Sequence, residues 1–200
     1  MRGSDRIVSW VILGPIAPIA LLLVGWWGSL SALHDSPAVG VIALCGFVVG
    51  IALDGTALRR RMETLFSMGD RPLLLVALFY SIGMYGFFMG FPVFNALIGA
   101  VGGFVVARRA AIMGWPCQRA LRDGWRVAIA MTWVLGGLCG VTAWLALNEA
   151  TMGSQLTSMF RLPFAVTRPM IYAIIIVGGV GLLALQYALA SLAARWFAPR

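Results

Sequence analysis

The sequence is poor in charge and contains no lysine. Charged residues make up 11% of its 200 residues, with 15 basic residues, all of them Arg, against 7 acidic residues. Soluble domains carry about 25% charged and 45–50% apolar residues, whereas 61% of this chain is hydrophobic and its mean hydropathy is +0.93. These shortages exclude a soluble globular enzyme and a disordered tail, and they predict an all-α membrane protein.

Histidine and cysteine are also scarce. The chain has one His and three Cys, at positions 45, 117 and 139, with no Cys-x-x-Cys spacing. A disulfide framework, a zinc site and bis-histidine haem ligation are therefore not expected. No Ser-His-Asp arrangement or phosphate-binding loop is present either, so we predict no enzyme activity, metal or cofactor. A net charge of +8 would suggest nucleic acid in a soluble protein, but the Arg residues lie between apolar runs, where membrane topology explains them.

The apolar runs predict six transmembrane helices. A bilayer core of about 30 Å is crossed by about 20 helical residues. We place the spans at about 7–33, 37–58, 72–90, 92–107, 126–147 and 169–194. The third and fourth come from one charge-free run, 72–107, which as a single helix would be roughly 54 Å long. The Gly- and Pro-containing segment 86–92 is its natural break, and Pro15 and Pro18 predict a kink in the first span.

The arginines predict the orientation of these spans. Six spans place thirteen Arg on one side, namely Arg2, Arg6, Arg59, Arg60, Arg61, Arg71, Arg108, Arg109, Arg119, Arg122, Arg126, Arg195 and Arg200. Only Arg161 and Arg168 lie on the other side. By the positive-inside rule both termini are cytoplasmic, and we expect a bacterial plasma or inner membrane.

Glycine pairs spaced four apart occur in four of the spans, at Gly46/Gly50, Gly86/Gly90, Gly99/Gly103 and Gly136/Gly140. Small residues let membrane helices approach closely, because lipid offers no hydrophobic drive for helices to associate. We interpret these pairs as packing faces within the bundle. The alternative is an interface with a second copy or with a membrane-protein partner.

Asp54 is the one acidic residue within a predicted span. Ionisable groups inside a membrane are candidate functional sites, so Asp54 could be a proton or cation site. The structural alternative pairs it with Arg59, Arg60 and Arg61, within two turns. The segment 54–59 also resembles the opening of the CDP-alcohol phosphatidyltransferase signature, Asp-Gly-x-x-Ala-Arg, which would imply a lipid-modifying enzyme. The segment departs from the signature at Leu58, and the further carboxylates that such chemistry needs are missing.

Four uncharged polar residues are further intramembrane candidates: Asn95, Tyr85, Thr142 and Gln186. A buried amide requires partners. We expect Asn95, Tyr85 and Thr142 at similar depth in the outer half, either as an interhelical hydrogen-bond cluster or as a polar pocket. Gln186 falls in the inner half. Only Tyr80 and Ser81 approach the central depth at which transporter sites are typical.

Two connections are long. The cytoplasmic connection 107–125 is rich in Arg, and Arg59, Arg60, Arg61, Arg108 and Arg109 are candidate contacts for anionic phospholipid. In the outer connection 148–168, Met152, Leu156, Met159 and Phe160 have the spacing of a short helix lying flat in the membrane interface, and the alternative is an irregular loop.

These features favour two function classes. The first is a small permease-like protein or transport-system subunit for a small solute, for which six spans, kinking prolines and an inner acid are suitable. The second is a non-catalytic subunit or assembly factor of a larger membrane complex, favoured by glycine faces and little extramembrane mass. A membrane-embedded lipid-modifying enzyme is third.

Overall fold

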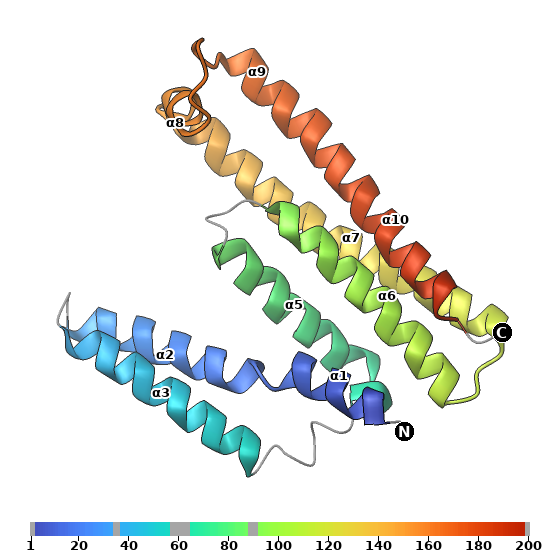
Figure 1. Cartoon of the computed structure of the whole chain (residues 1–200). Helices are drawn as coiled ribbons and strands as arrows, with labels where there is room; N and C mark the ends of the chain where they lie inside the picture. Colours follow the sequence, from blue (N-terminus) through green and yellow to red (C-terminus); the bar gives the residue numbers. More distant parts are fainter. Residues whose placement is uncertain (1–2, 34–36, 57–64, 88–91, 199–200) are drawn as a thin grey trace. The chain divides into compact units, whose positions relative to one another are not determined.

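The computed structural model describes residues 3–33, 37–56, 65–87 and 92–198, and every regular element in these ranges is helical. The elements are α1 (Gly3–Leu13), α2 (Ile16–Leu33), α3 (Ala38–Gly55), η1 (Leu65–Ser67), α5 (Asp70–Phe87), η2 (Pro92–Phe94), α6 (Asn95–Ile112), α7 (Cys117–Asn148), α8 (Met152–Met159), α9 (Arg168–Ala173), the π-helical turn η3 (Ile174–Gly178) and α10 (Gly179–Trp196) (Figure 1). The all-α prediction is confirmed for these residues.

Five helical stretches have the length and composition of membrane spans. They are Asp5–Leu33, Ala38–Gly55, Pro92–Ile112, Cys117–Asn148 and Arg168–Trp196. These stretches coincide with five of the six predicted spans. The remaining prediction, 72–90, corresponds to α5, which is not among the five; its first turn contains the charged residues Asp70 and Arg71.

Residues 1–76 form one compact unit, dominated by the antiparallel hairpin of α2 and α3 (Figure 1). The predicted kink lies between α1 and α2, at Gly14 and Pro15. The backbones of α2 and α3 meet at glycine, since a Cβ atom on Gly46 would overlap the carbonyl of Leu21. A Cβ on Gly50 would likewise overlap the backbone of Pro18. The Gly46/Gly50 pair therefore forms the predicted packing face.

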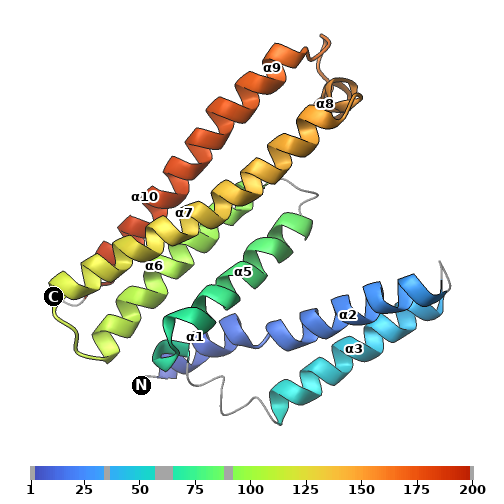
Figure 2. The same ribbon diagram turned by 180° about the vertical axis from the view of Figure 1, so that it is seen from behind.

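Residues 77–200 form the second unit, in which α6, α7 and α10 pack against one another (Figure 2). Gly99 faces Gln186 and Gly103 faces Ala190, so α6 and α10 run parallel. Gly124 of α7 faces Ala194, while Met131 is bonded to Gln186, so α7 runs antiparallel to α10. By contrast, a Cβ on Gly86 or Gly140 would meet nothing within 4 Å. Gly90 is outside the described residues.

The connection predicted at 107–125 is mostly helical. Helix α6 continues to Ile112 and α7 begins at Cys117, so residues 113–116 alone separate the two helices. The apolar run marks only the part of a helix that suits a membrane, and the helix itself extends beyond it. In the added turns of α7, Asp123 pairs with Arg119 at 3.7 Å and with Arg126 at 3.5 Å, at the spacing that supports an exposed helix.

Candidate functional site

Asn95 is the first residue of α6 and is 2% exposed. Its Nδ2 donates a hydrogen bond to the backbone carbonyl of Ser81 on α5, at 2.9 Å. Its Oδ1 is buried and has no hydrogen-bond partner within the described part of the chain. The residue thus joins α5 to α6 and leaves one acceptor unsatisfied.

Gln186 of α10 is equally buried, at 2% exposed. Its Nε2 donates to the backbone carbonyl of Met131 on α7, at 2.8 Å, and its Oε1 has no partner. The side chain crosses α6 at Gly99, where a Cβ atom would lie 2.6 Å from Gln186 Cγ. Glycine is therefore required for this amide to reach α7.

The two amides lie close together along α6. Asn95 and Gly99 are four residues apart, which corresponds to about 6 Å of helix rise on one face. Among the described residues neither amide oxygen has a hydrogen-bond partner, and both amides belong to the unit that contains α6, α7 and α10. Each such oxygen is costly to bury, by about 1–3 kcal/mol, unless a donor reaches it.

Tyr85 and Thr142 come together as a hydroxyl pair. Their oxygens are 3.1 Å apart, and Thr142 Oγ1 is also 2.9 Å from the carbonyl of Leu138 in its own helix. Since Tyr85 is on α5, this pair and the Asn95–Ser81 bond attach α5 to both α7 and α6. Asn95 bonds to Ser81 rather than to the Tyr85 pair.

Asp54 is buried at the carboxyl end of α3, at 6% exposed. Among the described residues its Oδ1 has no hydrogen-bond partner. Arg59, Arg60 and Arg61, the partners expected for it, lie outside the described residues, as does the second half of the 54–59 segment that resembles the phosphatidyltransferase signature. No group of three or more His, Cys, Asp or Glu residues suited to a metal ion occurs in the described ranges.

Arg109 belongs to a cluster around Trp115, in the turn between α6 and α7. The guanidinium carbons of Arg109 and Arg119 lie 5.2 and 4.3 Å from the centre of the Trp115 ring, on either side of this turn in sequence. Such cation–π contacts position arginines at the end of a helix pair. The turn itself depends on Gly114, whose φ of +65° is unfavourable for other residues.

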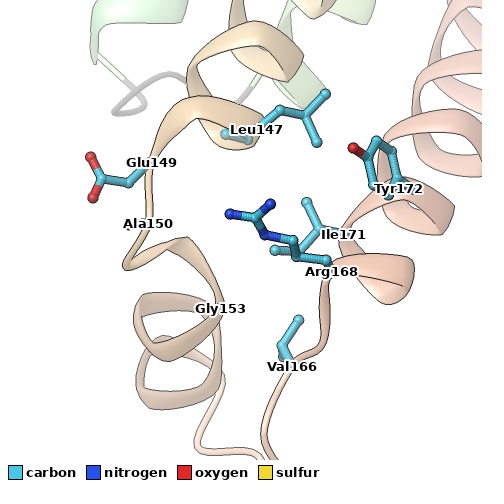
Figure 3. Close-up of a pocket in the computed structure, with 9 residues that line it drawn as sticks. Leu147, Glu149, Ala150, Gly153, Val166, Arg168, Ile171 and Tyr172 are labelled. Carbon is cyan, nitrogen blue, oxygen red and sulfur yellow. The ribbon is translucent and has the colours of Figure 1, made fainter.

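A cavity of about 120 Å³ lies at the opposite end of α7 (Figure 3). Its lining comes from the last turn of α7, the start of α8 and the start of α9, and comprises Ala146, Leu147, Glu149, Ala150, Gly153, Val166, Arg168, Ile171 and Tyr172. None of these residues was among the predicted site residues. The residue types gave no indication of this cavity, because it forms only when the 149–167 segment brings the start of α9 next to the end of α7.

Comparison with known proteins gives no match: neither a family model, nor a curated protein, nor a solved structure is similar to this chain.

Proposed function

We propose that this chain is a small permease-like protein or a transport-system subunit for a small solute. The observation that supports this best is that Asn95 and Gln186 are buried amides whose oxygens have no hydrogen-bond partner among the described residues, with Asn95 one turn of α6 away from Gly99, which faces Gln186. Polar groups inside membrane spans mark pathways for substrates and ions. A solute bearing N–H or O–H donors, or a small cation, would satisfy these oxygens. The proposal includes no catalytic step and no cofactor.

Permeability of proteoliposomes tests this proposal, with glycerol, urea and methylammonium as probes. We expect faster osmotic swelling for at least one probe than in protein-free liposomes, and a loss of that difference in Gln186→Leu. Thr132→Val is the matched control, since the Thr132 hydroxyl bonds only to Ala128 O of its own helix. Swelling no faster than in protein-free liposomes would contradict a permease acting alone.

The proposed topology has six spans, with α5 as the third and with both termini in the cytoplasm of a bacterial cell. The thirteen-to-two distribution of Arg supports it. The attachment of α5 to two span-length helices through Ser81 and Tyr85 also supports it, because these contacts extend along more than one turn of α5.

A second candidate is a non-catalytic subunit of a larger membrane complex or a homo-oligomer. It is favoured by the glycines of α7, η3 and α10 that face open space, namely Gly137, Gly140, Gly178, Gly179 and Gly181. Their bare backbone would allow another helix to approach closely. Native mass spectrometry of the protein in mild detergent tests this: a dimer or defined complex that Gly140→Leu dissociates supports it, and a monomer throughout opposes it.

We also propose that anionic phospholipid binds the cytoplasmic face at Arg59, Arg60, Arg61, Arg108 and Arg109. Each juxtamembrane Arg near an anionic surface contributes about 1 kcal/mol. The Trp115 contact of Arg109 supports a positioned site. Retained phosphatidylglycerol or cardiolipin should be lost when Arg108 and Arg109 become Gln; identical lipid retention in a correctly inserted double variant would exclude this pair.

A further inference from the structure

Arg161 and Arg168 are the two arginines that the positive-inside rule leaves unexplained. Arg168 lines the 120 Å³ cavity, whereas Arg161 does not. In Figure 3 the Arg168 guanidinium extends into the space enclosed by Leu147 and Ile171, and the Tyr172 hydroxyl is directed toward the same side. The cavity therefore places one guanidinium group beside apolar side chains.

The backbone that leads to Arg168 is fixed against α8. Val166 N donates to Thr157 Oγ1 at 3.0 Å. A Cβ atom on Gly153 would lie 2.6 Å from Val166 O, so the chain passes directly over a glycine. These two contacts fix the backbone position of Val166, two residues before Arg168, and so position one wall of the cavity.

Glu149, the one carboxylate among the lining residues, is engaged elsewhere. Its Oε1 accepts hydrogen bonds from Thr151 Oγ1 at 2.6 Å and from Thr151 N at 3.3 Å. These bonds lower the pKa of Glu149, so the group stays ionised while pointing away from the cavity (Figure 3). Among the described residues, no carboxylate forms an ion pair with Arg168.

We propose that this cavity binds a phosphate-type oxyanion through Arg168. A guanidinium matches phosphate oxygens with two parallel N–H donors. A cavity of roughly 150 Å³ is known to hold a benzene molecule, so 120 Å³ has room for a phosphate group but not for a whole lipid. The cavity lies where the apolar parts of α7 and of the 168–196 helix end, which is the depth of phospholipid headgroups. The site is separate from the inner arginines and does not depend on transport.

Lipid and free phosphate are distinguished by titrating the purified full-length protein with each. Dioleoyl phosphatidylglycerol binding is measured by native mass spectrometry and sodium phosphate binding by calorimetry, both in the Arg108→Gln/Arg109→Gln background. Arg168→Gln is the test variant, and Arg161→Gln is the matched control that removes the same charge from the same end. Size-exclusion profiles and helical circular dichroism establish that each variant is folded, and Arg168→Lys serves as a second variant that keeps the charge.

We expect Arg168→Gln to weaken binding about tenfold, as for loss of one charge-assisted hydrogen-bond pair, with a smaller effect for Arg168→Lys and none for Arg161→Gln. An effect on the lipid assigns the site to a headgroup, and an effect on inorganic phosphate alone assigns it to the free ion. Equal losses in Arg168→Gln and Arg161→Gln, or unchanged binding of both ligands in Arg168→Gln, would overturn the proposal.

Discussion

Single glycines decide where the helix backbones of this protein touch. The spacing of four residues predicted four packing faces, and among the described residues two of these pairs, Gly46/Gly50 and Gly99/Gly103, lie in close backbone contact with a neighbouring helix. Gly86 and Gly140 have the same spacing but face open space. Sequence spacing shows that a helix has a face lined by glycine, but which of these faces packs against another helix depends on the path of the connecting segments. That information is not contained in the spacing.

Gly103→Ala should destabilise the second unit by about 1–3 kcal/mol, because the added methyl group would overlap the carbonyl of Ala190 and force α6 and α10 apart. Thermal unfolding in a mild detergent measures this change. Gly140→Ala is the control and should change stability little, since its Cβ would meet no atom within 4 Å. Equal destabilisation by both substitutions would contradict the packing described here.

Asp54→Asn tests whether the buried acid is structural. We expect normal yield, a modest loss of stability because the predicted pairing of Asp54 with the arginine cluster at 59–61 would be removed, and unchanged proteoliposome permeability. Asp123→Asn, which removes the exposed pairs with Arg119 and Arg126, is the control for loss of one carboxylate. Abolished permeability at normal folded yield would instead identify Asp54 as a coupling site.

At the scale of helices, the apolar runs located five span-length helices well but located their ends poorly. Helix α7 begins nine residues before the predicted start at 126, in turns where Arg119, Asp123 and Arg126 are charged yet favourably spaced for a helix. The hydrogen-bond partners of Asn95 and Gln186 could not be predicted either. Both donate to backbone carbonyls, of Ser81 and Met131, and residue type carries no signal for such an acceptor.

In the 148–168 connection, where the apolar spacing left a short helix and an irregular loop open, α8 is present at Met152–Met159. The contact between α8 and the Val166 backbone should depend on Gly153. We expect Gly153→Ala to displace the Val166 backbone, with which the new methyl group would overlap. Faster backbone amide exchange at Val166 is the measurement. Ser154→Ala, at an exposed position that bonds only within its own segment, should leave this exchange unchanged; equal rates in both variants would show that Gly153 has no such role.

At the scale of the whole molecule, two helical units are built from an arginine-only, apolar chain. Five helices are long and apolar enough to cross a membrane. The six-span topology differs from a five-span topology in that α5 also crosses the membrane. An even number of spans returns the chain to the side on which it began. The two ends of the protein therefore report directly on whether α5 crosses.

Fluorescent and alkaline phosphatase reporters fused in turn to each terminus give the most direct test of the six-span account. We predict that both fluorescent fusions are bright and both phosphatase fusions inactive, as six spans with cytoplasmic termini require. In the same cells a cysteine introduced at Ser154, with Cys45, Cys117 and Cys139 replaced by alanine, should react with an impermeant maleimide from outside. Termini on opposite sides, or a Ser154 position on the same side as both ends, would contradict the account.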